Sequence, residues 1–108
     1  MLHGVRSFGV ALTLALVSLT AAAAEDSGWH HVTRVTAAHG VTTVELDGVF
    51  PSGCAQSDHA FQITHTDTTG AAMHGTALAA LLSGRELRAV FSGQCARGHN
   101  RATSVEIR

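Results

Sequence analysis

Residues 71–83, AAMHGTALAALLS, are the one stretch of this chain whose pattern predicts a helix, and its place among the strands decides the fold. Alanine, leucine and methionine dominate the stretch, and these residues favour helices. Residues 67–70 (DTTG) offer Asp or Thr as a cap for the first turn, and Gly84 stands where a helix-ending glycine belongs. The positions predicted to face the core follow a helical period: Met73, Ala77, Leu78, Leu81 and Leu82.

Five stretches around this helix have the composition of β-strands, with Val, Thr and aromatic residues in partial apolar–polar alternation. They are residues 29–36 (WHHVTRVT), 41–48 (VTTVELDG), 59–64 (HAFQIT), 86–92 (ELRAVFS) and 102–108 (ATSVEIR). The predicted order is therefore β-β-β-α-β-β. Five strands with a helix between the third and the fourth are typical of the OB-fold, a small barrel whose closure removes exposed strand edges. We therefore predict a mainly β protein with one helix, an OB-fold-like five-stranded barrel.

The chain has two cysteines, Cys54 and Cys95. An isolated pair in a small exported domain predicts one disulfide, which would join the loop after the second strand to the turn-rich stretch 93–100 after the fourth. The alternative is two free thiols or two metal ligands, although cysteines so far apart lack the close spacing of zinc-binding pairs. Closing a loop of this length would contribute about 4 kcal/mol to stability.

Residues 1–24 have the three parts of a secretory signal peptide. A positively charged start precedes an apolar run over 8–19 (FGVALTLALVSL), and Ala22-x-Ala24 fits a signal-peptidase site. An uncleaved membrane anchor is the alternative, but a spanning helix needs about 20 apolar residues. We expect cleavage after Ala24, so that residues 25–108 form one small domain, periplasmic or secreted, with no membrane span.

Charge and composition argue against several functions. Seven basic residues, all arginine, stand against eight acidic ones, and a nucleic-acid-binding surface would need a basic excess. Ser52 lies in a Pro-Ser-Gly-Cys stretch but lacks the G-x-S-x-G elbow of a nucleophilic serine. Glu45 and Asp47 share a strand face and are predicted to be solvated charges. We therefore expect no enzymatic centre and no cofactor.

Histidine is unusually frequent, with eight residues in the whole chain. Neutral imidazole is a common ligand of transition metals, so metal capture is an alternative function. His59 and His65 could approach His99 across the barrel, whereas the adjacent His30 and His31 should point to opposite faces of a strand. No metal-binding helix spacing occurs, and the competing interpretation is a set of scattered surface histidines.

Four pieces of the chain, taken in order, carry a resemblance to a known family: Ser52-Gly53-Cys54, residues 71–83, Gly93-Gln94-Cys95 and residues 102–108. In this arrangement the chain resembles small exported bacterial proteins related to the pentameric B subunit of subtilase cytotoxin. The likeness covers nearly all of residues 25–108. It implies a domain that assembles as a homo-oligomeric ring, a pentamer, and that binds cell-surface glycans.

The function expected from this resemblance is a non-enzymatic binding module that recognises glycan or protein ligands through several identical copies. The nearest neighbourhood for sugar contacts is Thr33 and Thr36 on the first predicted strand. Trp29 is the only tryptophan in a chain without tyrosine, and it is either a sugar-stacking ring or a core or cap residue. Two other functions remain open: a monomeric periplasmic accessory or metal-handling protein, and a structural partner of another exported protein.

Overall fold

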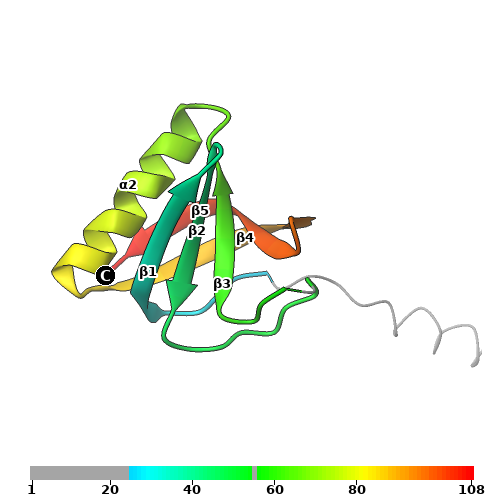
Figure 1. Ribbon diagram of the computed structural model, residues 1–108. Helices are drawn as coiled ribbons and strands as arrows, with labels where there is room; N and C mark the ends of the chain where they lie inside the picture. Colours follow the sequence, from blue (N-terminus) through cyan, green and yellow to red (C-terminus); the bar gives the residue numbers. More distant parts are fainter. Residues whose placement is uncertain (1–24, 55) are drawn as a thin grey trace, which may run out of the picture.

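The computed structural model describes residues 25–54 and 56–108, and the predicted signal peptide lies outside the described residues. Five strands and one helix follow one another in the predicted order, with the helix between the third and fourth strands (Figure 1). Their bounds are β1 (His30–Ala38), β2 (Val41–Leu46), β3 (Ala60–Thr64), α2 (Thr68–Ser83), β4 (Glu86–Ala96) and β5 (His99–Ile107).

The five strands form one closed sheet in the order β1-β2-β3-β5-β4. Neighbouring strands are antiparallel except β3 and β5, which are parallel. Two joints are narrow, because β3 meets β5 over two residue pairs and β1 meets β4 over two as well. The chain before β1 extends the second joint: Asp26 forms a bridge to Val90, and the Ser27 amide donates to the Ala89 carbonyl at 2.9 Å.

The core fills the inside of the closed sheet. Alternate residues of β2 are buried, as expected for a strand with one face on a core. Among the largest fully buried side chains are Val44, Phe61, Ile63 and Leu87. The ring of Phe61 packs against that of Phe91, with centroids 5.9 Å apart. The element order and the closed sheet confirm the expectation of a mainly β fold with one helix.

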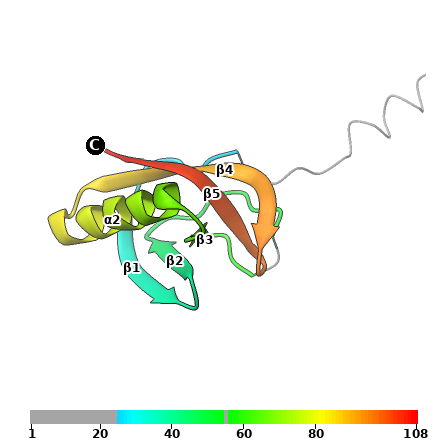
Figure 2. The same cartoon turned by 90° about the horizontal axis from the view of Figure 1, so that it is seen from above.

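Helix α2 covers one opening of the closed sheet, with β1 on one side and β4 and β5 on the other (Figure 2). The face that it buries consists of Gly70, Met73, Ala77 and Ala80. The predicted leucine stripe was therefore wrong in part: Leu78 and Leu81 are only partly buried, and Leu82 is 83% exposed. Glycine and alanine on the buried face let the helix backbone approach the sheet closely, which leaves the longer leucines at its sides or in solvent.

The ends of α2 follow the predicted capping residues. The helix begins at Thr68, before the expected Ala71, because Asp67 acts as its cap and accepts a hydrogen bond from the Gly70 amide at 3.0 Å. It ends at Gly84, whose φ of 68° lies in the left-handed region that glycine adopts without strain. Among the described residues, no helix is long and apolar enough to cross a membrane.

Cys54 and Cys95 form a disulfide, which confirms the predicted pair. The predicted setting of Cys95 was wrong, however, because the stretch 93–100 is not a loop. Strand β4 continues through Cys95 to Ala96, with an irregular register against β5 that is typical of a bulge. This part of β4 contains glycine and polar residues, so it lacks the apolar–polar alternation that indicates a strand in a sequence. The bridge therefore ties the loop after β2 to a strand.

Reduction of this disulfide should lower the free energy of unfolding by about 4 kcal/mol. The two cysteines are 41 positions apart, so the bridge closes a long loop in the unfolded chain and lowers its entropy. Chemical denaturation with and without a reductant measures the difference. A double variant, Cys54→Ser with Cys95→Ser, should show the lower stability under both conditions. Equal stabilities of the oxidised and reduced protein would contradict the expectation.

Alanine at two glycines of α2 should have opposite effects. A Cβ at Gly75 meets nothing within 4 Å, so Gly75→Ala should stabilise the protein by about 0.5–1 kcal/mol. A Cβ at Gly70 would collide with the carbonyl oxygen of Thr64, so Gly70→Ala should destabilise it by about 1–3 kcal/mol. Thermal unfolding of the two variants measures both signs. A stabilising Gly70→Ala would mean that α2 does not approach the end of β3 this closely, and a destabilising Gly75→Ala would contradict the open space at Gly75.

Candidate functional site

A small polar cavity of about 190 Å³ lies where the β3–α2 loop and the start of α2 meet β5. We call it the threonine pocket. Its lining consists of Thr64, Thr66, Asp67, Thr69, Met73, Arg101, Ala102 and Thr103.

Two features of the fold bring these side chains together. On one side, the cap formed by Asp67 places the β3–α2 loop and the first turn of α2 beside the cavity. On the other side, the parallel pairing of Gln62 with Arg101 sets the end of β3 next to the middle of β5. None of the ion pairs among the described residues involves Arg101. In this part of the chain, its guanidinium donors are therefore not paired with a carboxylate.

The chemistry of the lining suits a small ligand rich in oxygen. A threonine hydroxyl can donate one hydrogen bond and accept others, and the Arg101 guanidinium carries five N–H donors. The Thr103 hydroxyl already donates to the Val90 carbonyl at 3.2 Å, which leaves the hydroxyls of Thr64, Thr66 and Thr69. Met73 and Ala102 add apolar surface at the same cavity. Sequence analysis did not find this pocket because its residues come from two distant segments. The threonine-rich run at 64–69 was the one local signal.

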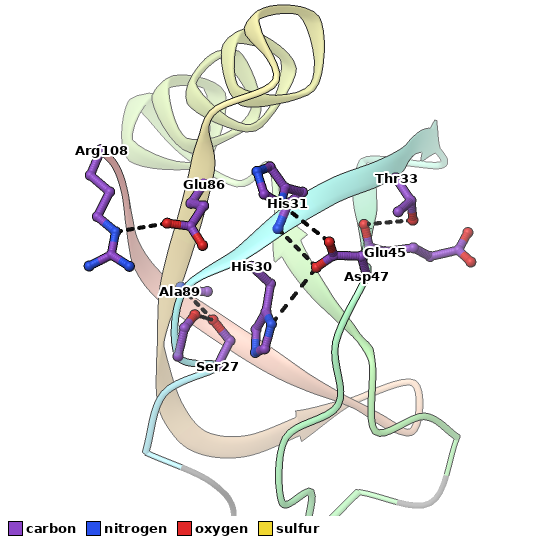
Figure 3. A network of polar contacts seen from close by, with 10 residues as sticks. Ser27, His30, His31, Thr33, Glu45, Asp47, Glu86, Ala89 and Arg108 are labelled. Carbon is purple, nitrogen blue, oxygen red and sulfur yellow. Dashed lines mark hydrogen bonds and ion pairs between the residues drawn. The ribbon is translucent and has the colours of Figure 1, made fainter.

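The predicted sugar-stacking residue, Trp29, is half-buried and covered by arginines. The guanidinium carbon of Arg108 lies 4.5 Å from the centre of its ring, and that of Arg88 lies 5.5 Å away. Glu86 accepts a hydrogen bond from Arg108 at 3.0 Å (Figure 3), and Glu106 accepts one from Arg88 at 2.7 Å. The ring is thus part of a cation–π cluster, which fits the cap interpretation of this residue.

The two threonines predicted to lie near a sugar site, Thr33 and Thr36, are exposed on β1. The Thr33 hydroxyl donates to the backbone carbonyl of Glu45 at 3.2 Å, which links β1 to β2 (Figure 3). Neither threonine lines either of the two cavities described here. Trp29 lines neither cavity either, so no cavity found among the described residues joins Trp29 to Thr33 and Thr36.

A second, wider cavity of about 300 Å³ lies beside the disulfide and is lined by Ser52, Cys54, Gln56, Ser57 and Asp58. The Ser52 hydroxyl oxygen accepts hydrogen bonds from the buried Asn100 side chain at 2.9 Å and from the Cys54 amide at 3.1 Å. No imidazole is among its hydrogen-bond partners in the described residues. Ser52 therefore holds the loop around the disulfide in place.

The adjacent histidines His30 and His31 extend to opposite sides of β1, and both have a ring nitrogen within 4 Å of the Asp47 carboxylate (Figure 3). Asp47 accepts from the His31 amide at 3.0 Å, and its carboxylate lies 3.2 Å from His31 Nδ1 and 3.8 Å from His30 Nδ1. Asp47 directly follows the end of β2 and reaches both residues at the start of β1, a shared contact that strand alternation does not report. A Cβ at Gly48 would collide with the His30 ring, so this glycine makes room for it.

The three histidines predicted as a metal site, His59, His65 and His99, have different neighbours. His59 lies beside two carboxylates, 3.4 Å from that of Asp58 and 3.9 Å from that of Glu45. His99 Nδ1 faces the backbone carbonyl two residues before it, at 3.3 Å. Among residues 25–54 and 56–108, no group of three or more His, Cys, Asp or Glu side chains is arranged to hold a metal ion.

His65 belongs instead to a cluster that sequence analysis did not find. Its Nε2 and the Nδ1 of His74 both contact the hydroxyl of Thr42, the latter at 2.8 Å. The two imidazoles meet edge to face, with ring centroids 5.1 Å apart. The three residues come from β2, the β3–α2 loop and the second turn of α2, so only the folded chain brings them together.

Comparison of the chain with protein-family models, with curated proteins and with solved structures gave no match. Its function is therefore inferred from the geometry of its own residues.

Proposed function

We propose that this chain is an exported, non-enzymatic binding module that recognises a saccharide at the threonine pocket. Several copies of the chain form a homo-oligomeric ring, so that one ring carries several such pockets. We assign it to the OB-fold on three grounds: the order of its elements, the helix between β3 and β4, and the β1-β2-β3-β5-β4 closed sheet. The resemblance to B subunits of the subtilase cytotoxin type supports the same fold and the ring.

The disulfide supports the exported location. Disulfides form and persist in oxidising compartments and are rare in the cytosol. The Cys54–Cys95 bridge joins segments that are far apart in sequence, so it belongs to the mature fold. An oxidising location, periplasmic or extracellular, is consistent with the predicted signal peptide.

The lining of the threonine pocket is the observation that carries the proposed function. The hydroxyls of Thr64, Thr66 and Thr69 and the guanidinium of Arg101 offer donors and acceptors to the hydroxyl groups of one sugar ring. Met73 and Ala102 offer apolar contact to its C–H groups. Asp67 is the one carboxylate of the lining and is engaged by the Gly70 amide, whereas glycoside hydrolysis generally requires a pair. Binding without cleavage fits this lining better.

The size of the pocket explains why a ring would matter. Cavities for drug-sized ligands measure about 300–1,000 Å³, and this one holds about 190 Å³. A single pocket therefore contacts about one sugar residue and binds weakly. Several pockets on one rigid ring raise the overall affinity by about 10²–10⁴ when they engage a surface together.

Replacing Arg101 should weaken saccharide binding about 10- to 100-fold, because a hydrogen bond from a charged donor contributes about 1.5–3 kcal/mol. A glycan array identifies the ligand, and calorimetry compares the variants Arg101→Gln and Thr66→Val with the unchanged protein. Thr33→Val and Thr36→Val are the matched controls, since both threonines lie on β1 outside the pocket. Loss of binding in the controls alone would place the site on β1, and failure to bind any saccharide would overturn the proposal.

The oxidised protein should elute from size exclusion with a mass of about five chains by light scattering, as the resemblance implies. The measurement is repeated over a hundredfold range of concentration, because a weak ring dissociates on dilution. A monomer at every concentration would rule out the ring. The pocket variants Arg101→Gln and Thr66→Val should keep the same mass, which separates assembly from ligand binding.

A further inference from the structure

The Thr42 hydroxyl brings two imidazoles together. Thr42 is fully buried, and its hydroxyl can donate to one ring nitrogen while it accepts from the other. Two ring nitrogens face it, Nε2 of His65 and Nδ1 of His74. One lies directly after β3 and the other on α2, so two independent elements aim a nitrogen at the same point.

These two imidazoles differ electrostatically from several others in the chain. His30, His31 and His59 each lie within 4 Å of a carboxylate oxygen. Among the described residues, no such ion pair involves His65 or His74, and both rings are half-buried. A neutral imidazole offers a lone pair on one of its two ring nitrogens, which is the form that binds a metal ion.

The separation of the two rings matches shared coordination of one metal ion. Transition metals such as zinc bind imidazole nitrogen at about 2.0–2.1 Å. Two imidazoles on one tetrahedral ion at that distance have ring centres roughly 5 Å apart. The centroids of His65 and His74 are 5.1 Å apart. The ion would take the place of the Thr42 hydroxyl between the two nitrogens, so metal binding requires the Thr42 side chain to turn about its Cα–Cβ bond.

We propose that His65 and His74 form a binding site for one divalent transition-metal ion, with two imidazole ligands from the protein and water entering from the exposed side of the half-buried rings. Imidazole suits copper and zinc, and copper binds more tightly than zinc at a given nitrogen site. The ion would join α2 to the end of β3. Neither histidine lines the threonine pocket, so metal binding and saccharide binding can be measured separately.

Titration of Cu²⁺, and separately of Zn²⁺, into the oxidised protein at pH 7.5 tests the proposal by calorimetry. The variants His65→Ala and His74→Ala should each lose one site per chain or weaken it at least tenfold. His39→Asn is the matched control, because His39 is an exposed turn residue with φ 54° that asparagine tolerates, and it should keep the site. Equal binding in all four proteins would overturn the proposal, as would the absence of binding.

A second readout guards against variants that fail to fold. Metal at one hundred times its Kd should raise the Tm of the unchanged protein by about 10–20 °C, and the shift should vanish in His65→Gln and His74→Gln. Glutamine can still hydrogen-bond to the Thr42 hydroxyl, so these variants preserve the local contact. A metal-induced shift that persists in both glutamine variants would place the metal elsewhere.

Discussion

Both candidate sites depend on the close packing of α2 against the closed sheet. The helix makes this contact through Gly70, Ala77 and Ala80, and a larger residue at Gly70 would strike the end of β3. Small side chains bury little apolar area, but they bring the two backbones together. The first turn of α2 can then form one wall of the threonine pocket, while the second turn places His74 against Thr42.

The closed sheet itself is held by few strand pairs at two of its joints, and other interactions reinforce them. At the β1–β4 joint, Asp26 and Ser27 continue the pairing along β4, and Trp29 lies against arginines from β4 and the end of β5. On the far side of the sheet, the disulfide joins the β2–β3 loop to β4. A domain of this size buries a modest core, so a covalent link carries a large share of its stability.

Local patterns predicted the parts of this structure that local energetics control. The element order, the capped helix and the cysteine pair all followed from propensity, caps and composition. The errors arose where tertiary contacts decide. Burial of Ala80 in place of Leu82 depends on how near the helix comes to the sheet, which helical period does not report. The continuation of β4 through Cys95 depends on pairing with β5 across a bulge.

The site residues illustrate the same limit more strongly. The contacts of His65 and His74 with Thr42, and of His30 and His31 with Asp47, join residues that no sequence spacing relates. The threonine pocket depends on the parallel joint between β3 and β5, because strand pairing of distant segments sets which side chains share a cavity. The composition indicated histidine and threonine as candidate ligand-binding residues. Which of these side chains are in contact depends on the tertiary structure.

The position of β5 has a consequence for the order in which the chain can fold. It lies between β3 and β4, although both precede it in sequence, and its antiparallel pairing with β4 is the local one. Until residues 99–107 are available, β3 and β4 each present an open edge, which is the feature that promotes intermolecular pairing. The β4–β5 hairpin can form early, but its docking on β3 is a long-range step of the kind that slows folding. A chain emerging from its N-terminus therefore stays vulnerable to aggregation until its last strand arrives.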